Sequence, residues 1–311
     1  MRLVSLDPIT TGNHRHEVLS HQAISDPPDH ACEGCVTSSV VRMGQVLEDH
    51  YLIECRLGGG LLADVYRAHD LRHGRQVAIK VFSSSTTSSI GEQRFLREIQ
   101  TTARLNHPHL LPVYDSGVTS GLLYYVMPFV AGGSLAALLT TEGRVAIHTT
   151  LRIIREVADG LAFAHRRGVV HRDIKPDNVM WSGDHAQIAD FGIAKPINGP
   201  ARSRLSVAGT PLGTPSYMAP EQVMGQDSID HRADIYSTGI LAYELLTGNT
   251  LFPHQTLEST MYAQLYEEPA PLRSLRSAIP RSVVNLVNRC IHKDPRRRWQ
   301  SMTELRDAID R

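Results

Sequence analysis

The sequence carries no net charge and few cysteines, and both features exclude classes of protein. Lys plus Arg and Asp plus Glu each number 32, so the charge balance gives no reason to expect nucleic acid or an anionic membrane as the main partner. Four cysteines are too few and too unevenly spaced to cross-link a chain of 311 residues, which favours a reducing compartment. We therefore expect a cytoplasmic protein that needs no disulfide.

The sequence also lacks a long hydrophobic run. No stretch reaches the ~18 apolar residues that a membrane helix requires, and the first residues, MRLVSLDPITT, have no basic-then-apolar signal pattern. Hydrophobic residues make up 41% and charged residues 21% of the chain, which is ordinary for a globular protein. We expect no membrane span in this chain and a large buried core.

The first 44 residues differ in character from the rest of the chain. They contain Pro27, Pro28 and scattered polar residues with no sustained period, which predicts a poorly ordered N-terminal extension. The folded domain is then expected over residues 45–311. Within the extension Cys32 and Cys35 could donate zinc ligands, but a second pair with firm spacing is missing.

Glycine clusters and short apolar runs dominate the start of the domain. Between residues 51 and 82 the apolar runs are alternating or β-branched, which predicts hairpins of an antiparallel sheet. The stretch SSSTTSS (83–89) is predicted to be a polar linker that could also receive phosphate. We expect a first lobe over about residues 45–130 and a second over about 131–311.

One helix is predicted inside the first lobe. Phe95, Ile99 and Ala103 recur at four-residue intervals, which indicates one face of a helix over residues 90–105. Two more strand-like runs follow at LLPVYDSG and LLYYVMPFV. The first lobe is therefore predicted to be a sheet crossed by a single helix.

The second lobe is predicted to be mainly helical. Residues 149–167 place apolar side chains and His165 on one stripe, and DIYSTGILAYELLTG (234–248) is apolar almost all round. A helix that is hydrophobic on every side belongs at the centre of a core. The fold class is therefore expected to be α+β, with one sheet lobe and one larger helical lobe.

A glycine-rich turn precedes a lysine in an apolar strand. The turn LGGGLLADVY contains Gly58, Gly59 and Gly60, which would let the backbone approach a phosphate closely. Lys80 follows on the next strand but one, where a buried cation needs a partner, and Glu98 could supply it. Taken alone, a plain hairpin turn and a structural Lys80–Glu98 pair explain these residues equally well.

Two later motifs make a family resemblance specific. HRDIKPDN (171–178) and IADFGIAK (188–195), together with the glycine-rich loop, resemble the eukaryotic-type serine/threonine protein kinases, in particular their bacterial branch. The resemblance runs from about residue 46 to the end of the sequence, with the motifs in family order. It implies a bilobal protein-kinase fold, with a small antiparallel sheet lobe carrying one helix and a larger helical lobe.

The resemblance implies a role for each polar residue of these motifs. Asp173 would accept the proton of the attacking hydroxyl, Lys175 would steady the transferred phosphoryl group, and Asn178 and Asp190 would hold Mg²⁺. Lys80, paired with Glu98, would bind the ATP phosphates. The expected cofactors are therefore ATP and Mg²⁺, which suits oxygen ligands of this kind.

The nucleotide would lie between the two lobes. The resemblance places adenine against apolar side chains near Met127, which matches the gatekeeper position, and against the backbone of Phe129 and Val130. Pro128 departs from the acidic residue common in the family, and it has no N–H to offer. The full set expected to bind ATP is Leu57, Gly58, Gly59, Gly60, Val65, Ala78, Lys80, Met127, Phe129 and Val130.

The segment GTPLGTPSYMAPE (209–221) points to protein substrates with Ser or Thr. By resemblance Thr214 borders the substrate site, whereas Thr210 matches the usual activating phosphosite. Arg172 and Lys195 would form a basic pocket that a phosphate on Thr210 neutralises. We expect autophosphorylation there, with self-association of the chain as a route to it.

Three further residues have structural roles implied by the resemblance. Glu221 would pair with Arg298, and Asp234 would hold the backbone of the HRD loop. Trp299 replaces the proline common after that arginine, and Cys55 and Cys290 have apolar neighbours that indicate buried positions.

Two rival functions stay open at this point. A pseudokinase would bind ATP or a partner without chemistry, although every polar motif residue is present. A small-molecule kinase would share the fold but lack the GTPSYMAPE segment. The chain could also be a piece of a membrane-anchored receptor kinase, since such domains often precede a membrane helix in the bacterial branch.

Overall fold

The computed structural model describes residues 41–60, 62–191, 215–226, 228–254 and 256–311. Thr210, Thr214 and Lys195 lie outside the described residues, as do Cys32 and Cys35. Val41, inside the predicted N-terminal extension, is buried and packs with the sheet residues Tyr66 and Val77.

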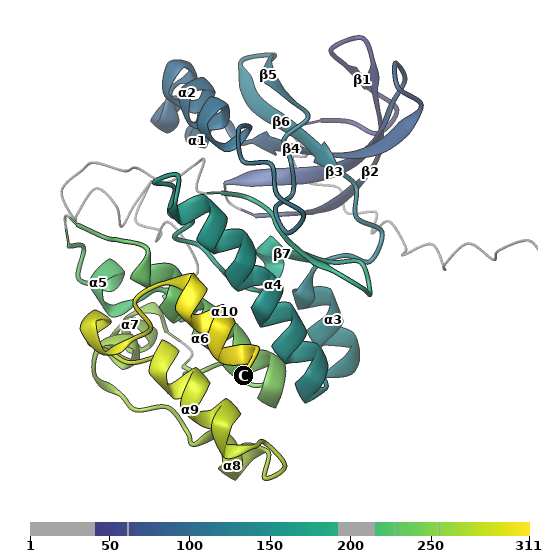
Figure 1. Ribbon diagram of the computed structural model, residues 1–311. Coiled ribbons are helices and arrows are strands. Elements are labelled where there is room, and N and C mark those ends of the chain that lie inside the picture. Colours follow the sequence, from purple (N-terminus) through teal and green to yellow (C-terminus); the bar gives the residue numbers. More distant parts are fainter. Residues whose placement is uncertain (1–40, 61, 192–214, 227, 255) are drawn as a thin grey trace, which may run out of the picture. The chain divides into compact units, whose positions relative to one another are not determined.

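A six-stranded antiparallel sheet forms the first half of the described chain (Figure 1). The spatial order is β1-β2-β3-β4-β6-β5, and each neighbouring pair is antiparallel, so the predicted hairpins are confirmed. The strands are β1 (Val46–Leu47), β2 (Tyr51–Gly59), β3 (Ala63–Asp70), β4 (Arg75–Phe82), β5 (Asp115–Thr119) and β6 (Leu122–Pro128).

Alternation along β4 separates two apolar clusters on the two faces of the sheet. Val77 and Ile79 belong to one cluster, whereas Ala78 and Phe82 belong to the other, together with residues of the following helix. Successive side chains of a strand point to opposite faces. Lys80 therefore lies on the same face as Ala78 and Phe82.

Residues 83–89 do not form the expected linker. Helix α1 (Ser84–Ile90) begins there, capped by Ser83, whose side chain accepts a hydrogen bond from the backbone N–H of Thr86. Thr86 is buried, and Thr87 Oγ1 accepts a bond from the N–H of Leu123 at 3.3 Å. The linker prediction was wrong because capping and tertiary contacts outweigh the weak helix propensity of Ser and Thr.

Helix α2 (Glu92–Thr102) follows at once and packs on the sheet (Figure 1). Phe95 and Ile99 are buried as the periodicity predicts, and the Phe95 ring lies 5.6 Å from that of Phe82. Ala103, the third residue of the predicted stripe, is exposed at the C-cap. The predicted helix face is therefore correct for its first two positions only.

The second half is mainly helical, as predicted, with one small two-stranded sheet. Among the residues that the structure describes, 3₁₀ turns occur at Pro176–Asn178, Pro215–Tyr217 and Pro295–Arg297. The other elements are α3 (Leu135–Glu142), α4 (Ile147–His165), β7 (Val179–Trp181), β8 (Ala186–Ile188), α5 (Pro220–Val223), α6 (Arg232–Thr247), α7 (Leu257–Tyr266), α8 (Leu272–Leu275), α9 (Arg281–Cys290) and α10 (Met302–Ile309).

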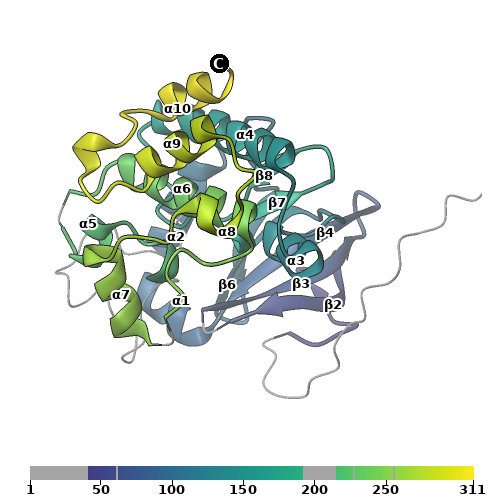
Figure 2. The ribbon, with the colours of Figure 1, turned by 90° about the horizontal axis from the view of Figure 1, so that it is seen from below.

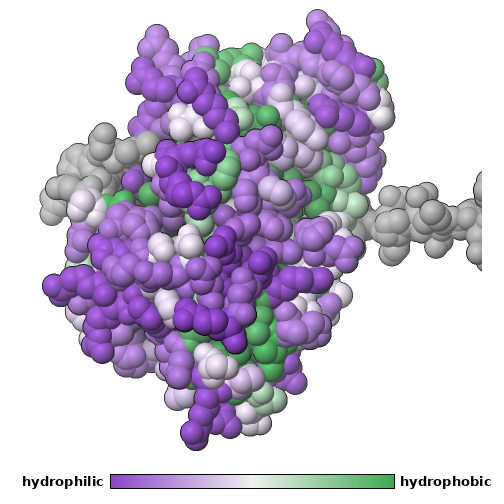
Figure 3. All heavy atoms as spheres, in the orientation of Figure 1, coloured by the Kyte–Doolittle hydropathy of each residue, from purple (hydrophilic) through white to green (hydrophobic). Residues whose placement is uncertain are grey.

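Helix α6 is the centre of this half. Fourteen of its residues are buried, and α4, α8 and α9 contact it from different sides (Figure 2). The helix predicted to be apolar all round is thus confirmed in the core. Hydrophilic side chains cover most of the face shown in Figure 3. No helix among the described residues is both long and apolar enough to cross a membrane.

The segment after α2 is tied to the helical half by backbone hydrogen bonds. The N–H of Ile188 in β8 donates to the carbonyl of His109 at 2.9 Å, and the N–H of Leu111 donates to the carbonyl of Ile188 at 2.8 Å. These bonds fix residues 109–111 beside Ile188 at the end of β8, next to the residues that follow β8. Those residues include Asp190.

A buried ion pair links α5 to the segment between α9 and α10. Arg298 is fully buried, and its guanidinium donates to both oxygens of Glu221 at 2.7 and 2.8 Å, which confirms the expected pair. Trp299 is accommodated beside it, with its ring under the guanidinium of Arg289 at 3.9 Å. Cys55 and Cys290 are buried, as expected.

Replacing Glu221 by Gln should strongly destabilise the protein. The variant leaves the Arg298 charge buried without its counter-charge, which costs about 3–5 kcal/mol in other proteins. Asp310→Asn is the matched control, because Asp310 pairs with Arg155 at 2.6 Å but both side chains are 44–45% exposed. That control should lose less than about 1 kcal/mol. Guanidinium unfolding monitored by circular dichroism gives the free energy of unfolding of both variants. An equal loss of stability in the two variants would contradict the claim that Glu221 neutralises a buried charge.

Candidate active site

The glycine-rich turn joins β2 to β3. A Cβ atom at Gly59 would lie only 1.9 Å from Asp64 Oδ1, so a larger residue there would require the Asp64 side chain to shift. Asp64 is held there by Arg56, whose Nη2 lies 2.7 Å from the same oxygen. At Gly58 and Gly60 a Cβ would meet nothing within 4 Å. The turn is therefore tight at its middle glycine and open at the other two.

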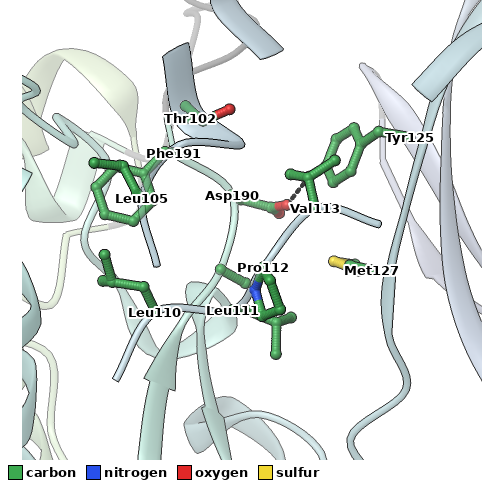
Figure 4. A pocket seen from close by; sticks show the side chains of 11 residues that line it. Thr102, Leu105, Leu110, Leu111, Pro112, Val113, Tyr125, Met127, Asp190 and Phe191 are labelled. Carbon is green, nitrogen blue, oxygen red and sulfur yellow. Dashed lines mark hydrogen bonds between the residues drawn. The ribbon is translucent and has the colours of Figure 1, made fainter. Parts of the chain in front are cut away.

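Lys80 and Asp190 bring the sheet and the helical half together. Lys80 Nζ lies 2.5 Å from Asp190 Oδ2, and each side chain is about one-fifth exposed. The hydroxyl of Tyr125 donates to the other oxygen of Asp190, Oδ1 (Figure 4). Burial acts to raise the pKa of Asp190, but the charge of Lys80 and both hydrogen bonds outweigh it, so the pKa lies below its ordinary value.

Glu98 has a different partner from the expected one. Arg94, one turn earlier on α2, donates to Glu98 Oε1 at 2.9 Å, so the expected Lys80–Glu98 pair is replaced by two other pairs in this conformation. Glu98 Oε2 is buried and has no hydrogen-bond partner among the described residues. Burial raises the pKa of Glu98 more than Arg94 lowers it. The catalytic role of Glu98 stays a prediction.

The loop that begins at His171 is held by a buried carboxylate from α6. Asp234 accepts hydrogen bonds from the backbone N–H groups of His171 and Arg172 at 2.8 and 2.7 Å, and from His165 Nε2 at 2.8 Å. Arg172 has a φ of 65°, an unfavourable value for a residue with a side chain, which the clamp offsets. The expected role of Asp234 is confirmed.

Three polar residues of this loop converge. Asn178 Nδ2 donates to the carbonyl of Asp173 at 2.8 Å and to its Oδ2 at 3.1 Å, while Lys175 Nζ lies 3.9 Å from the same Oδ2. The N–H of Ala189 donates to the carbonyl of Asn178 at 2.9 Å. The chain before Asp190 is therefore bonded directly to the loop that carries Asp173.

The oxygen donors of this region suit Mg²⁺. Asn178 turns its Nδ2 toward Asp173, which leaves its oxygen as the atom to face a cation, and Asp190 adds an ionised carboxylate. No group of three or more His, Cys, Asp or Glu that could hold a metal occurs among the described residues. Mg²⁺ commonly takes only one or two protein ligands, with phosphates and water completing its shell.

An apolar wall lies beside these groups. Ala78 and Met127 are buried, and Val65 packs against the same cluster, while their contact with adenine stays a prediction. A pocket runs from Met127 past Val113 to Asp190 (Figure 4). Phe129 and Val130 follow β6 and are partly exposed. Leu57, also predicted to bind ATP, is 47% exposed.

Two residues near the site were not predicted from the sequence. Tyr125 bonds to Asp190, and Arg94 bonds to Glu98. The four-residue spacing of Arg94 and Glu98 is a signal for a pair on one helix face. Tyr125 gave no such local signal, because its proximity depends on strand register.

Comparison with known proteins identifies the family of this chain. The family model for the protein kinase domain matches residues 51–308. The chain belongs to the protein kinase family. Serine/threonine-protein kinase PknB of Mycobacterium tuberculosis is 36% identical over 271 residues, which is 85% of this chain and 43% of that protein. The resemblance to bacterial serine/threonine kinases is thus confirmed.

Two other bacterial relatives are similar. A probable serine/threonine-protein kinase of Clostridium acetobutylicum is 35% identical over 86% of this chain and 40% of its own length. The probable serine/threonine-protein kinase pknA2 of Bifidobacterium longum is 37% identical over 78% of this chain and 32% of its own length. The chain therefore spans less than half the length of these relatives.

Replacing Asp234 by Asn should destabilise the kinase domain in a pH-dependent way. Asn can accept with only one oxygen, so a buried N–H loses its acceptor at a cost of about 1–3 kcal/mol. Burial raises the pKa of Asp234, but hydrogen bonds from His165 and the backbone lower the pKa by more than burial raises it. The net shift of the pKa is therefore downward. Its contribution is present above the unfolded value of ~3.9 and is lost as the pH falls through the folded value.

The difference in unfolding free energy between wild type and Asp234→Asn should therefore be constant from about pH 5 to 8 and narrow below about pH 4. Urea unfolding across that range measures it. A difference that does not change with pH would show that the Asp234 charge is not what matters.

Proposed function

We propose that the chain is an ATP-dependent serine/threonine protein kinase, which transfers the γ-phosphoryl group of ATP to Ser or Thr hydroxyls of protein substrates. One observation carries the proposal: the Lys80 cation from the sheet lies 2.5 Å from the Asp190 carboxylate, next to the loop that holds Asp173 and Asn178. This observation supports the proposal, because transfer of a phosphoryl group needs a cation for the phosphates, oxygen ligands for a metal and a carboxylate base close together.

Each residue then has a defined task. Asp173 accepts the proton of the attacking hydroxyl, and Lys175, 3.9 Å away, adds positive charge where the phosphoryl group passes. Asn178 and Asp190 would hold Mg²⁺, which when bound neutralises charge on the ATP phosphates. Lys80 binds the phosphates, and the glycine turn with Val65, Ala78 and Met127 encloses the nucleotide.

Binding of ATP requires Lys80 to exchange partners. The unpartnered Glu98 Oε2 is suited to receive Lys80 once phosphates draw it from Asp190. Arg94 opposes this only weakly, because pairs four residues apart on a helix contribute about 0.3–0.5 kcal/mol, and Arg94 is 38% exposed. The expected Lys80–Glu98 pair would then form when both side chains leave their present partners.

Replacing Asp173 by Asn should lower kcat by about 10²–10⁴-fold with little change in the KM for ATP. The amide cannot accept the hydroxyl proton, and a positioned base is typically worth that factor. Transfer of labelled phosphate from ATP with Mg²⁺, followed by phosphosite mapping, measures it. If wild type labels neither itself nor a Ser/Thr protein, a pseudokinase is favoured, whereas labelling of a small molecule alone would favour the other rival.

Autophosphorylation at Thr210 is proposed to activate the enzyme. Arg172 would help bind the phosphate, together with Lys195. In the described conformation Arg172 Nη2 donates to the carbonyl of Ile229 at 3.4 Å, a long bond that a phosphate could replace. Self-association would allow one copy to phosphorylate another, and Thr214 would border the substrate.

Thr210→Ala should reduce activity about tenfold or more relative to autophosphorylated wild type, because no phosphate can order the loop. Phosphatase treatment should bring wild type down to the same level. Asp173→Asn is the control that cannot label itself. The activation proposal would be wrong if Thr210→Ala matched fully phosphorylated wild type. A rate of self-labelling per molecule that is independent of concentration would argue against self-association.

The domain limits and the cellular location stay predictions. A domain over 45–311, with lobes meeting near residue 130, agrees with a family match over residues 51–308.

A further inference from the structure

Tyr125 and Lys80 form a cross-strand pair that ends on one carboxylate. In the antiparallel register of β4 and β6, Lys80 lies directly opposite Tyr125, so both side chains point to the same face of the sheet. Lys80 reaches Asp190 Oδ2 at 2.5 Å, and the Tyr125 hydroxyl donates to Asp190 Oδ1 (Figure 4). The two oxygens of the expected metal ligand thus have different partners.

These two partners differ in how easily they leave. Lys80 has a flexible stem and a task at the ATP phosphates under the proposed function. Tyr125 is 2% exposed, and its ring lies 6.1 Å from that of Phe82 in the packed cluster between the sheet and α2. Nucleotide binding therefore removes the partner of Oδ2 and leaves the partner of Oδ1 in place.

The Tyr125 hydroxyl can act only as a donor to this carboxylate. A carboxylate oxygen accepts hydrogen bonds, and the phenol O–H is the donor that Tyr125 offers to it. Phe would fill the same space in an apolar cluster. The hydroxyl is therefore explained by its bond to Asp190 rather than by packing.

We propose that Tyr125 is a positioning residue for magnesium: it holds Asp190 Oδ1, so that Oδ2, released by Lys80, faces the ion. The inference rests on the proposed function and concerns how this chain orients its own ligand. A carboxylate held at one oxygen loses rotational freedom before the metal arrives. Groups that orient metal ligands in this way are typically worth 10–100-fold in metal affinity.

Tyr125→Phe tests the inference with ADP and Mg²⁺ as probes. Titration calorimetry of the full chain gives the dissociation constant of ADP with excess Mg²⁺ and with EDTA, and their ratio is the gain due to the metal. We expect this gain to fall about tenfold in the variant, while affinity in EDTA and the unfolding midpoint are unchanged. A purely structural role would lower both affinities together.

Tyr124→Phe is the matched control. Tyr124 is the preceding residue of β6 and belongs to the cluster on the opposite face of the sheet, so it loses the same hydroxyl away from the site. The ratio of its ADP dissociation constants, in EDTA and with excess Mg²⁺, should equal that of wild type. An unchanged or larger gain in Tyr125→Phe would overturn the inference, as would parallel losses with and without the metal. If wild type itself gains nothing from Mg²⁺, the proposed function fails too.

Discussion

Carboxylates removed from water need partners, and this constraint governs the structure from the core to the site. A buried ionised carboxylate is tolerated only when charges or N–H groups replace its hydration. Glu221 is matched by Arg298, Asp234 by two backbone N–H groups and His165, and Asp190 by Lys80 and Tyr125. Each of these contacts joins segments far apart in the sequence, so satisfying the charges also assembles the domain.

The partners of these carboxylates are of two kinds. Some have no other task, and others can be exchanged when a nucleotide binds. Arg298 also donates to the carbonyl of His292 at 2.8 Å, and Asp234 is bonded three times, so neither has a competing task. Lys80 and Arg94 are different, because each holds its carboxylate through one partly exposed ion pair. The carboxylates of the scaffold are therefore held by partners with no other task, whereas Asp190 and Glu98 are each held in part by a partly exposed cation that can move away. That division lets a nucleotide rearrange the site without disturbing the fold.

The sequence was informative wherever the relevant residues are close along the chain. Asp173, Lys175 and Asn178 lie within six positions, so a single loop brings them together whatever the rest of the fold does. The apolar pattern of α6 likewise indicated a core helix on its own. Family resemblance added the long-range pairs of Glu221 and Asp234, which no local pattern contains.

Other features could not be read from the sequence for physical reasons. Residues 84–90 form α1 because Ser83 caps the helix and Thr86 and Thr87 find tertiary contacts, none of which composition reveals. Glu98 had two candidate partners in the sequence, Arg94 four residues earlier and Lys80 in the preceding strand, and the sequence does not say which one it contacts. Such choices depend on differences of about 1 kcal/mol or less.

The geometry around Asp190 finally depends on strand register. The alternation of β4 sends Val77, Ile79 and Val81 to one cluster, and a slip of one residue against β6 would move the whole set to the wrong face. The same slip would place Tyr124 opposite Lys80 and turn the Tyr125 hydroxyl away from Asp190. Apolar packing on the face of the sheet that carries Val77 and Ile79 thus determines which polar groups meet on the opposite face, beside Asp190. The core residues of the sheet are in this sense part of the site.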